Sequence, residues 1–155
     1  LLVDIGNSRL KWVWWHEGCF LPGGSFPSGR AALTDGFEQF WRKVSRPVAV
    51  YVANVRGPSA EFEVQAWMDA HWQVPVHFAQ SESVCSGVVN AYTQPERLGV
   101  DRWLALLGAR RELAGSVCVA DCGTALTVDF MDATGQHQGG VIAPGLTVMM
   151  VTHGR

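Results

Sequence analysis

The sequence predicts an α/β protein that contains two related halves, and two observations lead to this prediction. Apolar runs typical of strands come first and then alternate with stretches of helical periodicity, which is the pattern of layered α/β domains. A strand followed by Asp-x-Gly and a small polar side chain occurs twice, at residues 1–8 and at 117–124. This repetition indicates two related halves that each offer one turn to a shared polyanionic ligand.

The first of these turns is Asp4-Ile5-Gly6-Asn7-Ser8, with Lys11 close behind it. Because Gly6 has no side chain, several backbone N–H groups of the turn can approach one anion. Asp4 at the end of the strand can hold a hard cation, and Lys11 can reach a phosphate. An ordinary hairpin whose Asp and Asn only shape the turn is the alternative. The second copy, at Asp121, favours the anion-binding interpretation.

Apolar periodicity predicts the elements around the first turn. Residues 1–5 and 10–15 form an antiparallel hairpin, a third strand lies near 19–21, and residues 22–29 form a loop. Thr34 caps a helix whose apolar stripe contains Phe37, Phe40, Trp41 and Val44. Residues 48–55 are expected to form a strand covered on both faces, Ser59 to cap a helix to about residue 72, and 74–78 to form another strand.

A second set of elements follows a weakly periodic segment at residues 80–98. A helix is predicted from about Gly99 to Leu113, and its core-facing residues are Trp103, Leu106, Leu107 and Leu113. Residues 117–121 and 126–130 form a second hairpin, and 138–145 form a strand and turn rich in glycine. Arg110 is expected to extend its charge into solvent at the end of the helix.

Two charged residues in the first turn of that helix allow two interpretations each. A carboxylate at Asp101 is favoured by the helix dipole alone, and Arg102 could be an ordinary solvated charge. The alternative is that both side chains contact a ligand.

Composition excludes several classes of protein. With 48% hydrophobic and 17% charged residues, the chain can bury a core, and a net charge of −2 gives no general attraction to nucleic acid or membrane. No apolar run approaches the roughly 20 residues of a spanning helix, and no signal-like segment is present, so we expect the cytoplasm. G-x-G-x-x-G and P-loop motifs are absent. The four cysteines form no C-x-x-C pair, so we expect reduced structural thiols, with Cys118 and Cys122 buried, and no zinc site.

Taken together and in this order, the motifs resemble those of the type III pantothenate kinases, the Bvg accessory factor family. The matching pieces are Asp4 to Ser8 with Lys11, Tyr92, Gly99 to Trp103, Asp121 to Ala125, and Gly139 to Gly145. The resemblance implies an actin/sugar-kinase/Hsp70-like (ribonuclease H-like) fold of two duplicated halves. Residues 1–115 would form the N-terminal half with the first phosphate turn and the pantothenate motif. Residues 116–155 would begin a C-terminal half that is truncated in this chain, because they are too few to repeat the first.

The resemblance also implies an activity: transfer of the γ-phosphate of ATP to the primary hydroxyl of pantothenate, the first step of coenzyme A biosynthesis. The implied phosphate-binding residues are Asp4, Gly6, Asn7, Ser8, Lys11, Gly123 and Thr124. Asp4 would hold Mg²⁺ through water, and Asp121 would bind an activating monovalent cation, K⁺ or NH₄⁺. The implied pantothenate-binding residues are Tyr92, Gly99, Val100, Asp101 and Arg102, with Asp101 as the catalytic base.

These residue types suit the chemistry, because phosphoryl transfer needs positioning and charge neutralisation more than covalent help from the protein. Arg102 is the natural partner for the substrate carboxylate, which a guanidinium can bind with two parallel hydrogen bonds. The family pattern further implies a homodimer. Two alternatives stay open: a non-catalytic accessory or regulatory relative, and another small-molecule kinase of the same superfold.

Overall fold

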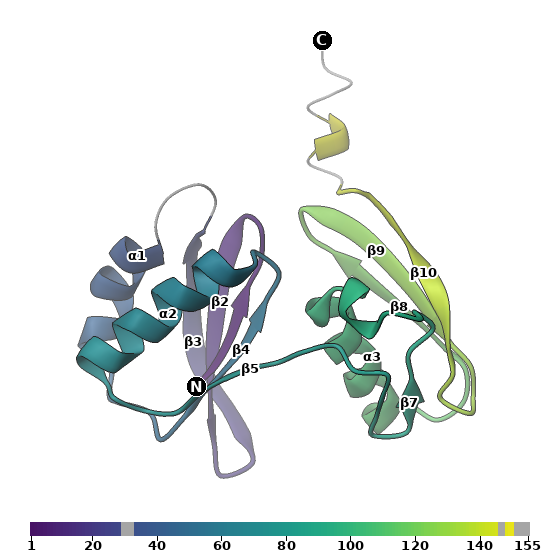
Figure 1. Cartoon of the computed structure of the whole chain (residues 1–155), viewed down its shortest axis with the longest axis horizontal. Coiled ribbons are helices and arrows are strands. Elements are labelled where there is room, and N and C mark those ends of the chain that lie inside the picture. The colour runs from purple at the N-terminus through teal and green to yellow at the C-terminus, as the bar shows by residue number, and fades with distance from the viewer. Residues whose placement is uncertain (29–32, 146–147, 151–155) are drawn as a thin grey trace. The chain divides into compact units, whose positions relative to one another are not determined.

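The computed structural model describes residues 1–28, 33–145 and 148–150, and the chain divides into two compact units, Leu1–Ala79 and Gln80–Arg155 (Figure 1). Each unit has its own sheet and its own hydrophobic core. The mixed α/β content agrees with the sequence prediction. The predicted division near residue 115 concerns duplicated halves rather than compact units, and it stays a prediction.

Unit 1 is built on a five-stranded sheet with the order β3-β2-β1-β4-β5. β1 (Leu2–Ile5), β2 (Arg9–His16) and β3 (Cys19–Pro27) form an antiparallel meander, and β4 (Val50–Asn54) and β5 (Val76–Phe78) run parallel to β1. The hairpin predicted around the first turn is therefore confirmed.

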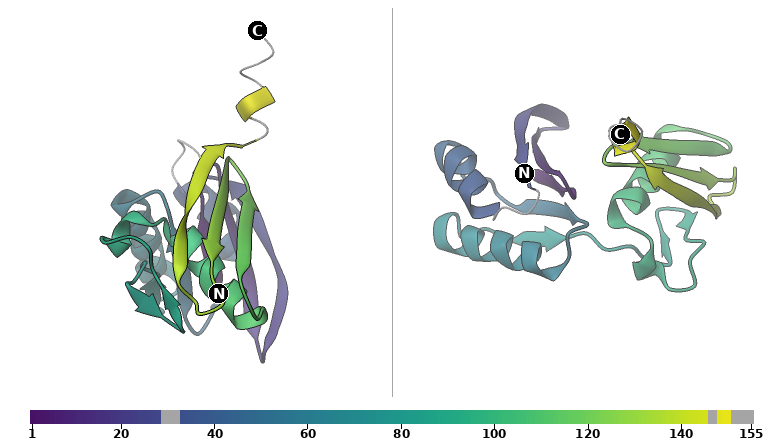
Figure 2. Two further views of the ribbon diagram at one scale, coloured as in Figure 1. Left: turned by 90° about the vertical axis from the view of Figure 1, so that its right-hand side faces the viewer. Right: turned by 90° about the horizontal axis from the view of Figure 1, so that it is seen from above.

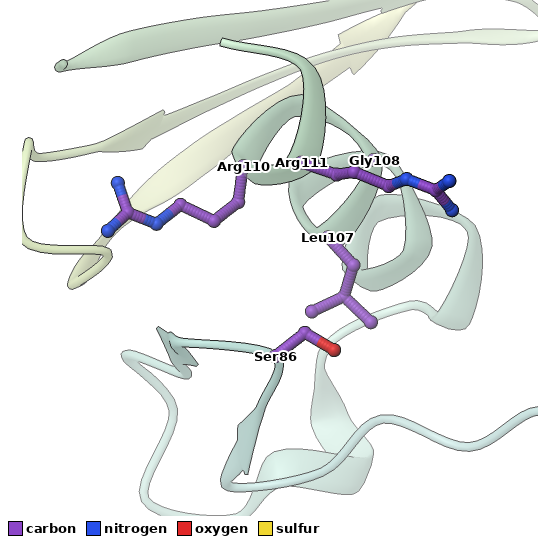
Figure 3. A pocket seen from close by; sticks show the side chains of 5 residues that line it. All are labelled: Ser86, Leu107, Gly108, Arg110 and Arg111. Carbon is purple, nitrogen blue, oxygen red and sulfur yellow. The ribbon is translucent and has the colours of Figure 1, made fainter. Parts of the chain in front are cut away.

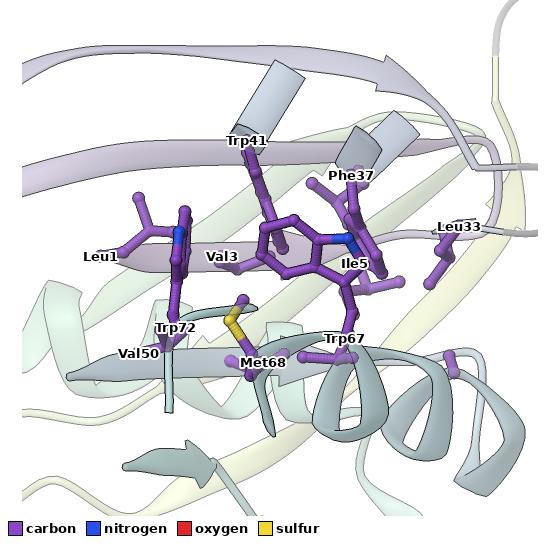
Figure 4. Packing of buried hydrophobic residues seen from close by; sticks show 14 of the residues in the cluster. Leu1, Val3, Ile5, Leu33, Phe37, Trp41, Val50, Trp67, Met68 and Trp72 are labelled. Atoms are coloured by element: carbon purple, nitrogen blue, oxygen red, sulfur yellow. The ribbon is translucent and has the colours of Figure 1, made fainter. Parts of the chain in front are cut away.

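Two helices cover one face of this sheet, as Figures 1 and 2 show. They are α1 (Leu33–Phe40), continued by the 3₁₀ turn η1 (Trp41–Lys43), and α2 (Pro58–His71). Trp41 lies at the centre of the core, where its ring stacks on Phe37 at 4.4 Å and meets Trp67 edge-on at 5.8 Å (Figure 4). Because side chains alternate along a strand, Val3 and Ile5 point into this core and Asp4 between them points away from the helices.

Three details of unit 1 differ from the sequence prediction. Residues 22–27 belong to the edge strand β3 and not to a loop, while Gly29 lies outside the described residues. A register shift opposite Trp12 and Trp14 accommodates Pro22, and a side chain at Gly23 would collide with the Trp12 carbonyl. An edge strand tolerates proline because one side of it donates no ladder bonds.

The other two concern burial and helix caps. Tyr51 on β4 is 54% exposed, so this strand is not covered on both faces in the described unit. Gly57, with φ of +83°, is the N-cap of α2 and Pro58 follows it, so Ser59 is not the cap. Thr34 lies inside α1, which begins at Leu33.

Unit 2 packs a helix against a three-stranded antiparallel sheet of order β10-β9-β8. Its elements are a small hairpin of β6 (Val84–Cys85) and β7 (Val88–Val89), the 3₁₀ turn η2 (Pro95–Arg97), α3 (Val100–Glu112), β8 (Val117–Cys122), β9 (Ala125–Met131) and β10 (His137–Pro144). Trp103 and Leu106 of α3 are fully buried with Met131 of β9. The second predicted hairpin and the predicted helix are thus confirmed.

Two burial predictions for unit 2 are wrong. Leu113 is 55% exposed because it caps the end of α3 in an extended conformation instead of continuing the helical stripe. Cys118 and Cys122 are exposed, since they lie on the face of β8 opposite Val117 and Val119, which pack towards the core. All four cysteines are free thiols, as predicted. Among the described residues, no helix is both long and apolar enough to cross a membrane.

Candidate functional site

The first Asp-x-Gly turn is a tight connection between β1 and β2. Asp4 and Lys11 are direct partners across the two strands, and the Lys11 Nζ lies 3.7 Å from Asp4 Oδ2. The Gly6 N–H donates to the Arg9 carbonyl at 3.0 Å, while Asn7 and Ser8 at the tip are exposed. The turn therefore presents a carboxylate, an ammonium group and two small polar side chains together on the surface of unit 1.

Ser28, which was not among the predicted site residues, stabilises this turn with two hydrogen bonds. Its hydroxyl donates to the Gly6 carbonyl at 2.8 Å, and its N–H donates to the Ser8 carbonyl at 2.9 Å. Ser28 itself is fully buried, whereas its partners Gly6 and Ser8 lie nearer the surface. The sequence around Ser28, Ser-Phe-Pro-Ser, carries no motif that predicts this role. The role follows from a contact between residues that are 22 positions apart, Gly6 and Ser28.

The second turn connects β8 to β9 and is held by the glycine-rich strand. The Gly123 N–H donates across the turn to the Ala125 carbonyl at 2.9 Å, and the Gly145 N–H donates to the Thr124 carbonyl at 3.0 Å. A Cβ at Gly145 would collide with the Gly123 and Thr124 carbonyls. Asp121 and Thr124 are exposed. Gly145 thus lets the end of β10 lie directly against this turn.

The N-terminus of α3 carries the predicted pantothenate motif. Gly99 is the N-cap, and Asp101 Oδ1 accepts a hydrogen bond from the Arg102 N–H at 2.8 Å. A Cβ at Gly99 would lie 2.7 Å from that same oxygen. The hydrogen bond from the Arg102 N–H orients the Asp101 carboxylate. Because Asp101 is half-buried, that carboxylate also reaches the surface of unit 2.

Arg102 points the other way, into unit 2, and its guanidinium binds Asp129 of β9. Nε donates to Oδ2 at 2.7 Å and Nη2 donates to Oδ1 at 2.6 Å, which is a two-pronged ion pair. Arg102 is 7% exposed and Asp129 2% exposed. The bonds to Asp129 raise the pKa of the Arg102 guanidinium, burial opposes that rise, and a hydrogen bond with Tyr92 adds to it. Arg102 is therefore not a solvated charge.

His137 of β10 completes this buried cluster. Its Nε2 lies 2.9 Å from Asp129 Oδ1, and its Nδ1 accepts the Ala91 N–H at 3.4 Å. A neutral imidazole has one donor and one acceptor, so Nε2 carries the proton and donates to Asp129. The Tyr92 ring lies parallel to the His137 ring, with centroids 6.2 Å apart.

The structure brings some of the predicted site residues together and leaves others in separate units. Tyr92, Asp101 and Arg102 share one region of unit 2, through the buried cluster and the first turn of α3. Asp121, Gly123 and Thr124 also belong to unit 2, on the turn at the end of its sheet. The residues predicted to bind phosphate, from Asp4 to Lys11, belong to unit 1.

A separate hollow of about 660 Å³ lies against the outer side of α3 (Figure 3). It is lined by Ser86, Leu107, Gly108, Arg110 and Arg111, none of which was predicted to bind ligand. The two arginine side chains extend in opposite directions in Figure 3, and Arg110 Nη1 donates to the Ala133 carbonyl at 3.1 Å. Arg110 thus bonds the loop before β10 as well as reaching solvent.

Metal-binding groups are sparse on the part of the chain that the structure describes. No cluster of three or more His, Cys, Asp or Glu side chains occurs there. Asp4 offers a single surface carboxylate, which is the donor type that Mg²⁺ uses when water and phosphate supply its other ligands.

Comparison with known proteins identifies the family. The family model for type III pantothenate kinase matches residues 1–152. This chain belongs to the type III pantothenate kinase family. The match includes both Asp-x-Gly turns, the α3 motif and the glycine-rich strand, so it confirms the resemblance seen in the sequence.

Curated members of this kinase family give the same answer. A type III pantothenate kinase from Nitrosococcus oceani is 40% identical over 154 residues, and one from Halorhodospira halophila is 37% identical over 158. These matches cover 96% of this chain but only 58% and 61% of the two relatives. The chain thus spans about three-fifths of the length of these type III pantothenate kinases.

Solved structures show that the fold is shared more widely than the family. A Baf family protein from Campylobacter jejuni matches with a TM-score of 0.54 at 22% identity, over 98% of this chain and 59% of that one. A Ppx/GppA phosphatase from Aquifex aeolicus matches with a TM-score of 0.51 at 15% identity, over 97% and 54%. At these identities the likeness concerns the fold alone.

Proposed function

We propose that the protein phosphorylates pantothenate with ATP, giving 4'-phosphopantothenate in the first step of coenzyme A biosynthesis. The observation that carries this proposal is the family match across residues 1–152, which includes each motif of the proposed site. The fold that we propose for the whole enzyme is the actin/sugar-kinase/Hsp70-like one, with two duplicated halves. Its expected setting is the cytoplasm.

Asp101 is the proposed catalytic base. Its Oδ1 is held by the Arg102 N–H, so the carboxylate has a fixed direction at the start of α3. A carboxylate in that position can accept the proton of the substrate hydroxyl and orient the oxygen towards phosphorus. Since phosphoryl transfer has a loose transition state, orientation contributes more here than basicity.

Arg102 and Tyr92 are the proposed contacts for the rest of pantothenate, together with the backbone of Gly99 and Val100. The Nε and Nη2 edge of Arg102 is already bonded to Asp129, so a two-pronged grip on the substrate carboxylate cannot use that edge. Nη1 and the second N–H of Nη2 form the other edge of the guanidinium, and any bond from Arg102 to substrate would use these donors. The ion pair with Asp129 thus leaves that edge as the proposed contact for the substrate carboxylate.

The two turns are the proposed phosphate sites. Gly6, Asn7, Ser8 and Lys11 would bind the triphosphate through backbone N–H groups and one ammonium group, with Gly123 and Thr124 on the second turn. Bound Mg²⁺ would neutralise phosphate charge, with Asp4 holding it through water. Asp121 would hold the activating K⁺ or NH₄⁺, because its exposed carboxylate is an oxygen donor suited to either ion.

The enzyme is also proposed to act as a homodimer, an expectation that rests on the family alone. ATP and pantothenate are its proposed ligands, and neither nucleic acid nor a membrane is expected among its partners.

A steady-state assay tests the proposal. ATP consumption by the intact protein should require pantothenate and Mg²⁺, and K⁺ or NH₄⁺ should increase it compared with Na⁺. Absence of pantothenate-dependent turnover with every one of these ions would refute the kinase activity and favour an accessory role. Turnover with pantothenate that no monovalent ion affects would refute only the role of Asp121.

A further inference from the structure

We propose that Asp129 and His137 are positioning residues for pantothenate, holding Arg102 and Tyr92 in the orientation that binds substrate. This inference rests on the proposed function and adds two residues that belong to none of its motifs. It depends on the buried cluster of unit 2, which we call the Arg102–Asp129–His137 cluster.

The cluster joins three elements of unit 2 through one carboxylate. Arg102 comes from the first turn of α3, Asp129 from β9 and His137 from β10. Asp129 Oδ1 accepts from both Arg102 Nη2 at 2.6 Å and His137 Nε2 at 2.9 Å, and Oδ2 accepts from Arg102 Nε at 2.7 Å. Each carboxylate oxygen is thus bonded, and the guanidinium has one permitted orientation.

His137 also orients Tyr92, the aromatic residue proposed to contact pantothenate. Its Nδ1 accepts from the Ala91 N–H, next to Tyr92, and its ring lies parallel to the Tyr92 ring with an interplanar angle of 10°. Tyr92 also helps to raise the pKa of the Arg102 guanidinium, so the two side chains lie near each other. The tyrosine is therefore oriented by a ring contact and by its neighbouring backbone, and both depend on His137.

The glycine-rich strand is shaped around the same pair. A Cβ at Gly140 would collide with Asp129 Oδ1 and with the Val128 carbonyl, and would lie 2.6 Å from Arg102 Nη2. The residues that follow Gly140, Val141 and Ile142, are exposed, so packing in that part of β10 does not itself demand a glycine. The backbone of β10 at Gly140 lies so close to the Arg102–Asp129 ion pair that only glycine fits there.

A purely structural role is the competing explanation, because the cluster also ties α3 to the sheet. Buried ion pairs add little net stability compared with apolar packing, and they are best attested where they specify one arrangement. Asp101, the neighbour of Arg102, is the proposed base, so the arrangement specified here is that of the substrate site. A positioning role predicts a selective effect on pantothenate, whereas a structural role predicts a general loss.

Two substitutions of His137 separate its two hydrogen bonds. Gln can place an amide N–H near the position of Nε2 and keep the bond to Asp129, whereas Asn reaches only the position of Nδ1. In the intact protein, His137→Asn should raise the pantothenate KM about 10-fold, as expected for loss of a bond to a charged group. His137→Gln should recover most of that loss. The ATP KM and kcat should change less than about 3-fold in both.

Asp129→Asn is the second test, since it removes one of the oxygens that Arg102 needs. It should raise the pantothenate KM by on the order of 10-fold to 100-fold, again with the ATP KM preserved. His77→Asn is the matched control, because His77 also stacks on a tyrosine, Tyr51 at 4.8 Å, but on the exposed surface of unit 1. This control should leave both KM values unchanged.

The outcomes distinguish the two proposals. No pantothenate-dependent turnover in the wild type would overturn the proposed function and, with it, this inference. Wild-type turnover with an unchanged pantothenate KM in His137→Asn, or with equal changes in both KM values, would overturn the inference alone. If the variants do not fold, ¹⁵N NMR of the wild-type imidazoles decides: we expect His137 to carry its proton on Nε2 and to respond to pantothenate. The other tautomer, or no response, would contradict the inference.

Discussion

At the start of α3, two neighbouring charged residues face opposite environments. Asp101 is half-buried with its carboxylate fixed by one backbone N–H, while Arg102 is buried and bonded to Asp129. Successive residues of a helix point about 100° apart, so adjacent positions can serve the surface and the core. The motif thus supplies the proposed base and a buried, ion-paired arginine from one helical turn.

The sequence predicted the position of this motif but not the partners of Arg102. Asp129 was part of an apolar strand prediction, and His137 lay just before the glycine-rich run. A lone carboxylate inside an apolar strand was a usable signal, because buried charges are almost always paired. Its partner could not be found from spacing, since the three residues meet only when α3 packs on the sheet.

Replacing Asp101 by Asn should lower turnover strongly. Removal of a general base typically costs on the order of 100-fold or more in kcat. The ATP KM should stay within about 3-fold of wild type, because we assign ATP to other residues. Glu96→Gln, which changes an exposed carboxylate of η2, is the control and should be silent. Near-normal turnover in Asp101→Asn would show that another group accepts the proton.

Gly140→Ala should destabilise the protein by about 1–3 kcal/mol, because the new methyl group collides with Asp129 and the Val128 carbonyl. Gly108→Ala on α3 meets no atom within 4 Å and should instead stabilise the helix by about 0.5–1 kcal/mol. Urea unfolding of both variants measures the contrast. Equal stability of the two variants would contradict the close approach of β10 to the ion pair.

At the scale of elements, the strands and helices follow from periodicity, while their ends depend on backbone geometry. β3 continues through Pro22 and Gly23 because a register shift opposite them absorbs the irregularity. Composition suggested a loop there, since Pro and Gly usually mark one. Similarly, Gly57 caps α2 through a positive φ, which no local pattern distinguishes from Ser59 two residues later.

The first turn depends on Ser28 at the end of β3. Ser28→Ala removes the hydroxyl that donates to the Gly6 carbonyl, at an expected cost of about 1 kcal/mol in unfolding free energy. We also expect weaker ATP binding, because the turn loses a buried support. Ser25→Ala is the control: its hydroxyl accepts only an exposed bond from Arg9 and should contribute less than about 0.5 kcal/mol. An equal ATP KM in Ser28→Ala and Ser25→Ala would contradict the role of Ser28 in shaping the first turn for ATP.

The loop between β9 and β10 is organised by Asp132, and this gives stability a pH dependence. Hydrogen bonds from the Thr134 hydroxyl and the Gln136 N–H lower the pKa of Asp132 below its usual 3.8. A lowered folded-state pKa means that the stabilisation is present above pH 3.8 and is lost as the pH falls through the folded value. NMR titration of the side-chain carboxyl should give a midpoint below 3.8. A midpoint at or above 3.8 would contradict the hydrogen bonds.

The Asp132→Asn variant isolates the pH-dependent stabilisation by Asp132, because an amide side chain cannot titrate. The unfolding free energy of this variant should fall less than that of the wild type when the pH is lowered through the acid range. Equal acid sensitivity of the two proteins would assign the pH dependence to other carboxylates.

At the scale of the whole molecule, the chain consists of two compact units, and each contains some of the proposed site residues. Unit 1 contains the first Asp-x-Gly turn, and unit 2 contains the second turn, the proposed base and the buried cluster. Repetition of the Asp-x-Gly turn was visible in the sequence, and the two hairpins are confirmed. Their supports, Ser28 for one and Gly145 for the other, are unrelated in sequence and could be found only from contacts.

The identity of the phosphorylated product tests the central claim most directly. The intact protein, incubated with ATP, Mg²⁺, K⁺ and pantothenate, should give a new ³¹P resonance of a phosphomonoester coupled to two methylene protons, as a phosphorylated primary alcohol requires. Release of inorganic phosphate at the same rate with and without pantothenate, and no ester signal, would contradict the account and indicate a phosphatase-like activity instead.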